Sequence, residues 1–151
     1  MRFNHMELTV PRGTLDELCG RADISQFYRE VFSWGAIDVE LFEQKNLLLH
    51  TDDEVSQFLL VSESDEPMRS PGFDHLGVLV ETRAEVDRLL DRCQEYAERD
   101  ERVSIKKYDD LDQQVVVIHA FYVKYILPIY FDVQCMEWRA DAAPKRRWSF
   151  G

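Results

Sequence analysis

The chain has 151 residues, of which 45% are hydrophobic, and its 29 acidic residues outnumber 18 basic ones, giving a formal net charge of -11. This length suits one domain, or two half-size modules around a shared core. The negative charge argues against nucleic acid or an anionic membrane as a partner.

The N-terminal segment predicts one strand followed by one helix. Alternating apolar residues indicate a strand over residues 2–10. Apolar residues at helical spacing indicate a helix over 14–32, with Thr14 as its N-cap and Glu17 three residues further on. Gly20 would divide this segment into two shorter helices.

Three further strands complete the first half of the chain. They are rich in valine, leucine and phenylalanine, with an acidic turn before the last of them. We expect them near residues 36–42, 46–51 and 57–63. Residues 64–72 contain proline, glycine and serine and form the expected linker.

The second half repeats this order. A strand over 73–81 precedes a helix over 83–99, and His75 leads this strand as His5 leads the first one, 70 residues earlier. The remaining strands are expected near 102–108, 115–125 and 129–138, with an acidic turn after the first and a hinge at Leu127-Pro128 before the last.

Together these elements predict an α+β fold of two tandem βαβββ modules, in which a cupped mixed sheet carries the helices on its outer face. We expect a single domain over residues 1–151. Its parts are module one over 1–63, the linker over 64–72, module two over 73–140 and a C-terminal tail over 141–151.

The cysteines and the N-terminus predict a cytoplasmic protein. Cys19, Cys93 and Cys135 are odd in number and lack CxxC spacing, which is typical of reduced thiols. Met1 is followed almost at once by a predicted strand, which leaves no room for a signal peptide, and no apolar run approaches the length of a membrane span.

A candidate metal site follows from the strand faces. His5 and His75 fall on the faces opposite the aliphatic rows that suit helix contact, and Glu137 lies on the last strand. If all three face one hollow, they form a two-histidine, one-carboxylate set, which suits Fe2+, Mn2+, Ni2+ or Zn2+ and leaves positions open for substrate. A single histidine on a strand is more often an ordinary core or surface residue, so the equivalent repeat positions carry this prediction.

Other polar residues are candidates for catalysis. Glu7 shares the face of His5 and is a candidate general base, or else a solvated carboxylate at the rim. His119 and Tyr125 share a face, and if it is inward they suit a proton donor and an oxyanion partner; otherwise they belong to an aromatic core.

Four segments resemble the vicinal oxygen chelate superfamily, which contains glyoxalases, bleomycin resistance proteins and extradiol dioxygenases. They are Phe3–Leu8, Phe27–Phe32, Phe73–Val78 and Met136–Trp138. The resemblance implies paired βαβββ modules around a divalent metal ion, with His5, His75 and Glu137 at ligand positions. It also implies a homodimer and a small-molecule substrate. Glyoxalase I-like members of the superfamily have a fourth protein ligand, and Glu63, at the end of its strand, is the nearest carboxylate to that position.

One departure concerns the last strand. The family often has an Asp-Pro-x-Gly turn before that strand, whereas this chain has Tyr125-Ile126-Leu127-Pro128. A shift of one residue in register would turn Glu137 to the other face.

The resemblance leaves three functions open. The first is a metal-dependent lyase, isomerase, epimerase or dioxygenase that acts on a small oxygen-chelating substrate. The second is a binding or resistance protein of the same fold, which sequesters an antibiotic-type ligand without turnover. The third is an interaction module with an idle site.

Overall fold

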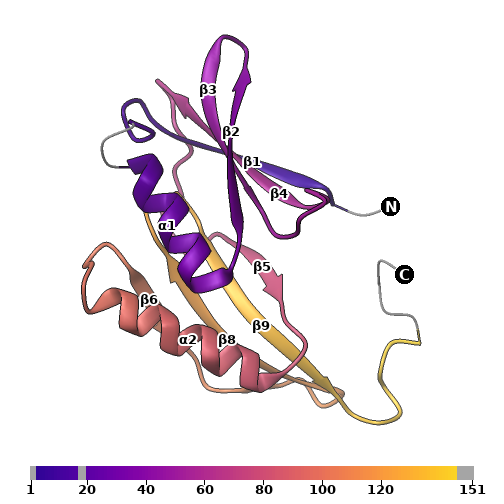
Figure 1. Ribbon diagram of the computed structural model, residues 1–151. Coiled ribbons are helices and arrows are strands. Elements are labelled where there is room, and N and C mark those ends of the chain that lie inside the picture. Colours follow the sequence, from indigo (N-terminus) through magenta and orange to yellow (C-terminus); the bar gives the residue numbers. More distant parts are fainter. Residues whose placement is uncertain (1–2, 17–19, 146–151) are drawn as a thin grey trace.

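The computed structural model describes residues 3–16 and 20–145 (Figure 1). Module one contains one helix and four strands within these residues. They are β1 (His5–Pro11), α1 (Gly20–Phe32), β2 (Gly35–Leu41), β3 (Gln44–His50) and β4 (Phe58–Ser64).

Module two contains one helix and five strands within the described residues. They are β5 (His75–Leu79), α2 (Arg83–Ala97), β6 (Ser104–Lys107), β7 (Leu111–Asp112), β8 (Val116–Lys124) and β9 (Tyr130–Trp138). The short strand β7 lies where the sequence predicted only an acidic turn, and it pairs with β8.

The two modules have the same topology, and this confirms the predicted α+β fold with its duplicated order of elements. Module one has the strand order β1-β4-β3-β2, and module two has β5-β9-β8-β6. In each module the first strand runs parallel to the last, β1 beside β4 and β5 beside β9. The strands form two separate sheets, one in each module, where the sequence predicted one cupped sheet.

A capping box begins the second helix. Thr82 caps α2 in a capping box, because its hydroxyl accepts from the Glu85 backbone N–H while the Glu85 carboxylate accepts from the Thr82 N–H. The described part of α1 begins at Gly20. Thr14 is not an N-cap but part of a turn in which its N–H donates to the Pro11 carbonyl. The predicted partner Glu17 lies outside the described residues.

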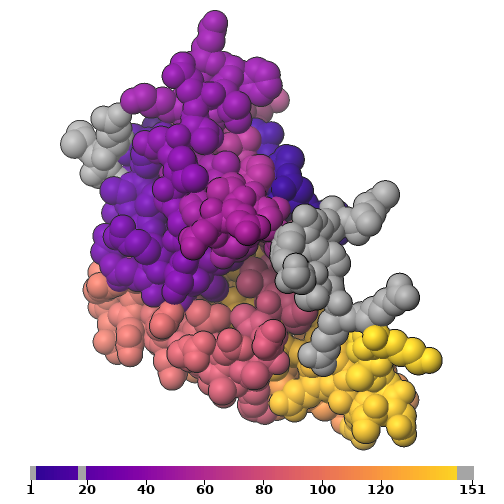
Figure 2. Space-filling view, turned by 45° about the vertical axis from the view of Figure 1, so that its right-hand side comes forward, coloured from indigo at the N-terminus to yellow at the C-terminus, as the bar shows by residue number. Residues whose placement is uncertain are grey.

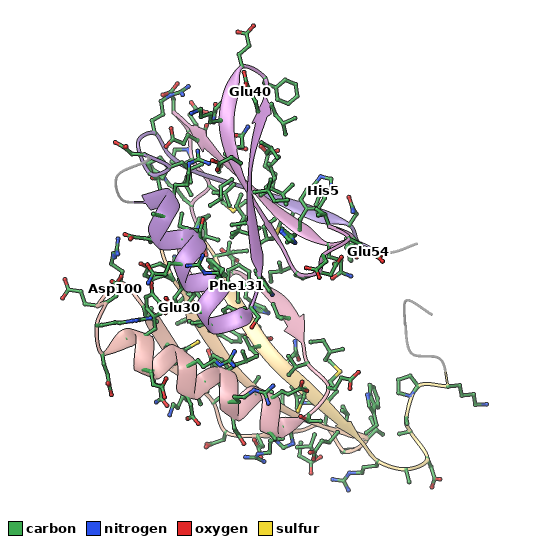
Figure 3. The ribbon with its side chains drawn as sticks, viewed as in Figure 1. His5, Glu30, Glu40, Glu54, Asp100 and Phe131 are labelled. Atoms are coloured by element: carbon green, nitrogen blue, oxygen red, sulfur yellow. The ribbon has the colours of Figure 1, made fainter. Side chains whose placement is uncertain are left out.

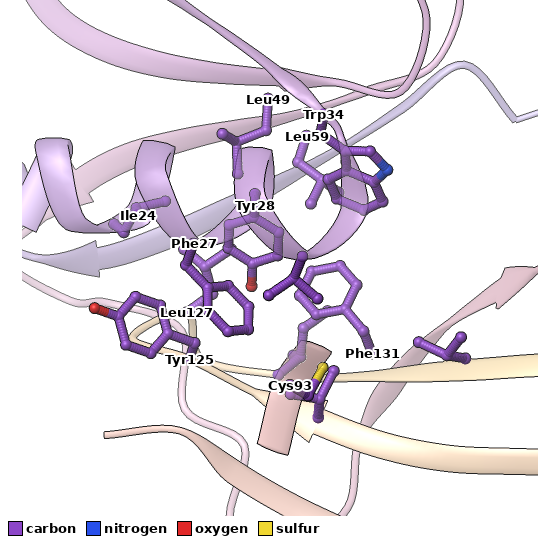
Figure 4. Close-up of a cluster of buried hydrophobic side chains, with 14 of the residues drawn as sticks. Ile24, Phe27, Tyr28, Trp34, Leu49, Leu59, Cys93, Tyr125, Leu127 and Phe131 are labelled. Carbon is purple, nitrogen blue, oxygen red and sulfur yellow. The ribbon is translucent and has the colours of Figure 1, made fainter. Parts of the chain in front are cut away.

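A continuous aromatic core joins the modules. Phe27 and Tyr28 of α1 pack against Tyr125 and Phe131 of module two, with the Phe27 and Tyr125 ring centroids 4.4 Å apart (Figure 4). Cys93 of α2 is buried in the same core. The space-filling view shows the N-terminal half of the chain, in indigo and purple, seated directly on the C-terminal half (Figure 2).

Polar contacts between the modules reinforce this core. Arg102 of module two forms an ion pair of 2.8 Å with Asp23 of α1, and Arg99 pairs with Glu30. Arg92 of α2 donates to the carbonyl of Val31 at 3.1 Å. These contacts tie α1 to module two and so hold the modules in one orientation.

The helices cover only one face of each sheet. Leu8 and Val10 of β1 are buried in the core, whereas His5 and Glu7, on the alternate face, are exposed. The same alternation exposes His75 on β5. Each module therefore has an open sheet face on the side away from its helix.

Two further predictions concern the thiols and the membrane. Cys93 and Cys135 are buried free thiols, and Cys19 lies outside the described residues. Within the described part of the chain, neither helix has the length and apolar character that crossing a membrane requires.

Candidate functional site

His75 and Asp132 form a pair on the open face of module two. In the parallel register of β5 and β9, Gly77 lies opposite Asp132, which places the alternate residue His75 on the same face as Asp132. His75 Nε2 lies 3.8 Å from Asp132 Oδ2. The side-chain amide of Gln134 donates to the same carboxylate oxygen at 3.1 Å.

The Asp132 carboxylate is buried and incompletely satisfied. The residue is 8% exposed, and its Oδ1 atom has no hydrogen-bond partner within the described part of the chain. Burial raises the pKa of Asp132 above its ordinary value, although the nearby His75 partly opposes this shift. A carboxylate oxygen in this state needs a cation or a donor from outside the chain.

The two histidines on the open faces present the same free ring nitrogen. His75 Nδ1 lies 2.8 Å from the Phe73 carbonyl oxygen, and His5 Nδ1 lies 2.8 Å from the Asn4 amide oxygen. Because these oxygens only accept, each Nδ1 carries the proton, which leaves the Nε2 lone pair free for a metal ion. Figure 3 shows His5 on β1, on the far side of module one from Glu30 and Asp100.

The pair in module two fits a divalent ion. Zinc and similar ions form bonds of about 2.0–2.2 Å to histidine nitrogen and carboxylate oxygen. The 3.8 Å gap between His75 Nε2 and Asp132 Oδ2 lies within the span of two such bonds. The pair alone is incomplete, since no group of three or more His, Cys, Asp or Glu residues that could hold a metal ion occurs among residues 3–16 and 20–145.

The structure places Glu137 away from this pair. Glu137 is five residues beyond Asp132, so the two carboxylates lie on opposite faces of β9. Glu137 Oε2 lies 3.1 Å from His119 Nε2, on the face of β9 that carries buried Cys135. The predicted convergence of His5, His75 and Glu137 therefore does not occur within one chain, because the core contacts of Cys135 fix the register of the strand.

His119 lies at the centre of a charged cluster on the helix-covered face. The residue is 5% exposed, and its Nδ1 lies 2.8 Å from Asp110 Oδ1 and 3.1 Å from Arg83 Nη1. Its Nε2 is at ion-pair distance from Glu137, although this contact is not aligned as a hydrogen bond. Burial by itself lowers the pKa of His119, but the two carboxylates outweigh it and raise the pKa. The cluster ties β8, β9 and the start of α2 together, and it does not face His75.

Tyr125 likewise lies in the core and not on the open face. The residue is fully buried, and its hydroxyl donates to Asp100 Oδ2 at 2.7 Å and accepts from Arg102 at 2.9 Å. Burial, together with the bond to Asp100, raises the pKa of this phenol well above its ordinary value. Both His119 and Tyr125 are therefore buried in the interior and do not face His75.

The remaining candidates have separate positions. Glu7 is exposed on the His5 face. Glu63 accepts from the Leu15 backbone N–H at 2.6 Å, and its register partner Val10 belongs to the core face of β1, so Glu63 does not share the His5 face. The His50 ring occupies the space in which a side chain on Gly35 would lie, and it is packed there.

Asp132 was missed by sequence reasoning, although a signal was present. It is an acid between Phe131 and Val133 in an otherwise apolar stretch, and a carboxylate is seldom buried without a functional or structural reason.

Comparisons with solved structures find the same fold at low sequence identity. A mutant of the fosfomycin resistance protein FosX from Listeria monocytogenes, in complex with Mn(II) and 1S,2S-dihydroxypropylphosphonic acid, has a TM-score of 0.63 and 15% identity. The match covers 96% of this chain and 98% of that one. A glyoxylase/bleomycin resistance protein/dioxygenase domain from Frankia has a TM-score of 0.57 and 19% identity, over 93% of each chain.

A third solved structure is a virulence protein from Salmonella typhimurium, with a TM-score of 0.57 and 16% identity. The match covers 89% of this chain and 96% of the Salmonella protein. No protein-family model and no curated protein sequence matches the chain. The chain has the fold of the vicinal oxygen chelate superfamily.

Proposed function

We propose that this protein is a metal-dependent enzyme that acts on a small oxygen-chelating substrate, with a divalent ion held by His75 and Asp132. The observation that carries this proposal is the buried Asp132 carboxylate, whose Oδ2 lies 3.8 Å from His75 Nε2 and whose Oδ1 has no hydrogen-bond partner among the described residues. Glu137, the carboxylate expected from the sequence, is replaced in this proposal by Asp132.

The donor set determines which ions fit. Imidazole nitrogen with carboxylate oxygen suits Fe2+, Mn2+, Ni2+ or Zn2+. Such an ion supplies Lewis-acid chemistry, because it draws electron density from two neighbouring oxygens of a bound substrate. Glu7 is proposed as the general base, since its carboxylate is exposed on the same face of β1 as His5.

The third ligand is proposed to be His5 of a second copy. His5 and the His75–Asp132 pair each lie on an open sheet face of their own module, and they form no three-residue group within the described residues. A homodimer in which module one of one copy faces module two of the other would bring His5 to the pair. The site would then have two histidines and one carboxylate.

A second candidate function is ligand binding without turnover. It is favoured by the exposed aromatic rings on the face that carries His75, since Phe73 and Tyr108 are 51% and 45% exposed. Turnover assays with a hemithioacetal and with a panel of catechols, the latter followed by oxygen consumption, separate the two functions. Binding without turnover of any substrate would favour the second.

The test is the metal content of untagged protein after incubation with each ion and removal of the excess. Wild type is expected to retain one ion per chain, whereas Asp132→Asn and His75→Ala retain none. Glu137→Gln is the matched control, because its carboxylate lies on the opposite face of the same strand, and it is expected to bind metal like wild type. If Glu137→Gln lost as much bound metal as Asp132→Asn, the assignment of Asp132 as a metal ligand would be overturned.

A further inference from the structure

Four aromatic rings form a cluster on the open face of module two, and one of them packs against His75. We call Phe73, Tyr108, Tyr122 and Tyr130 the aromatic wall. The His75 and Tyr122 ring centroids are 4.8 Å apart, and Tyr122 lies 5.0 Å from Tyr108 and 6.2 Å from Tyr130. Phe73 completes the wall at 5.6 Å from Tyr130.

The strand register places a cation in this wall. Lys106 of β6, Tyr122 of β8, Asp132 of β9 and Gly77 of β5 are successive register partners, so they form one row across the sheet. The backbones of Lys106 and Asp132 are two strand spacings of about 4.8 Å apart, and Tyr122 lies between them. Gly77 adds no side chain to the end of the row beside Asp132.

The lysine ammonium is held by the wall itself. Lys106 Nζ lies 3.5 Å from the centroid of Phe73 and 5.0 Å from that of Tyr108. Lys124 Nζ lies 5.5 Å from the centroid of Tyr130. Cation–π contacts of this kind orient an ammonium without neutralising its charge, so each lysine can still bind an anion.

The charge balance of this face differs from that of the whole chain. Alternation along β5, β6, β8 and β9 leaves Asp132 as the one acidic strand residue on the face, against two lysines. The chain as a whole has a net charge of -11. A cationic ligand would have to displace Lys106 from Phe73, whereas an anionic ligand would gain an ion pair with it.

We infer that the aromatic wall is a substrate subsite for a planar aromatic compound that bears an anionic group, with the ring on Tyr122 and the anion on Lys106. The inference deepens the proposed function, since it names the substrate class of the site at His75. In this arrangement the far edge of the ring points along the row toward Asp132, where the metal ion is proposed to lie.

The test uses metal-free, full-length protein, so that its outcome does not depend on metal binding. Benzoate is the probe, and backbone amide shifts in NMR spectra report its binding. Cyclohexanecarboxylate keeps the anion without the ring face, and benzyl alcohol keeps the ring without the anion. We expect benzoate to saturate the site and cyclohexanecarboxylate to bind several-fold more weakly, about 2- to 10-fold for one aromatic contact.

The matched variants lie on the two faces of β6. Lys106→Met is expected to weaken benzoate binding about tenfold, the effect of one charge-assisted hydrogen bond. Lys107→Met should leave it unchanged, because Lys107 pairs with the core residue Phe121 and lies on the opposite face. Benzyl alcohol, which lacks the anion, should bind both variants equally.

Three results would overturn the inference. They are unsaturable benzoate binding, equal affinity for benzoate and cyclohexanecarboxylate, and equal effects of the two lysine substitutions. A fourth result would come from sedimentation velocity. If Lys106→Met changes self-association but not benzoate affinity, the aromatic wall is a contact between chains and not a substrate subsite. Saturable benzoate binding in a protein that takes up no metal would refute the proposed function and leave this inference standing.

Discussion

Replacing Asp132 with asparagine should make the metal-free protein more stable while it abolishes metal binding. The asparagine side chain is nearly isosteric with the carboxylate, and the substitution removes a buried charge whose Oδ1 atom has no partner within the described residues. An unsatisfied buried polar group costs about 1–3 kcal/mol and a charged one costs more, so the amide removes the excess cost that is due to the charge. His75 at 3.8 Å offsets part of that excess in wild type, and a gain of about 1–2 kcal/mol is expected.

The expected gain is large enough to measure by thermal unfolding. For a chain of this size, 1 kcal/mol shifts Tm by about 2–4 °C, so Asp132→Asn should raise Tm by roughly 2–8 °C in the presence of a chelator. In saturating metal the order should reverse, because only wild type gains stability from the bound ion.

The pH dependence provides an internal control. Burial raises the pKa of Asp132 in the folded protein above its unfolded value, so the ionised carboxylate destabilises the fold. The stability that Asp132→Asn gains over wild type should therefore be complete above the pKa of Asp132 in the folded protein. It should disappear below about pH 4, where the carboxyl is protonated in both the folded and the unfolded state. A lower Tm for the variant at pH 7 without metal, or unchanged metal affinity, would refute the reasoning.

Three further substitutions test the other placements. Because the pKa of His119 is raised in the folded state, its stabilising effect should be complete below about pH 6.5 and lost as pH rises through the folded pKa. Urea unfolding of wild type should show this loss as the pH rises above about 6.5, and a His119→Gln variant with the same loss would contradict it. Tyr125→Phe removes the hydroxyl bonded to Asp100 and should cost about 1–2 kcal/mol in urea unfolding while metal uptake stays unchanged; a loss of metal would place Tyr125 in the site after all. Glu137→Gln should weaken the pH dependence of unfolding free energy that is due to His119, without lowering metal content. An unaltered pH dependence would show that the 3.1 Å contact between Glu137 and His119 contributes little to the raised pKa of His119.

The order of elements could be predicted from the sequence because each module has strong local signals. Alternation placed β1 and β5, and helical spacing after Thr82 placed α2, within a few residues of their observed bounds. The duplication was readable because His5 and His75 lead equivalent strands, and both lie on the open faces of their sheets.

The carboxylate of the candidate site could not be chosen from the sequence, because each face of β9 carries one acidic residue among apolar ones, Glu137 on one face and Asp132 on the other. Phe131 and Val133 are buried on one side and Met136 is half-buried on the other, so alternation alone did not show which side faces His75. The turn before β9 lacks the usual signal, since Ile126 adopts a φ of 57° where glycine is favoured. Packing of Leu127 and Ile129 into the core sets the register there, and this tertiary effect brought Asp132 to His75.

A mixed dimer tests the shared metal site most directly. A His5→Ala chain and a His75→Ala chain with different affinity tags are co-expressed, the mixed dimer is isolated through both tags, and its metal content is measured after tag removal. If the site joins His5 of one copy to His75 and Asp132 of the other, one of the two sites in the mixed dimer is intact. The proposal predicts one ion per mixed dimer and none in either parent dimer, and a mixed dimer without metal beside a wild type that binds it would contradict a site shared between copies.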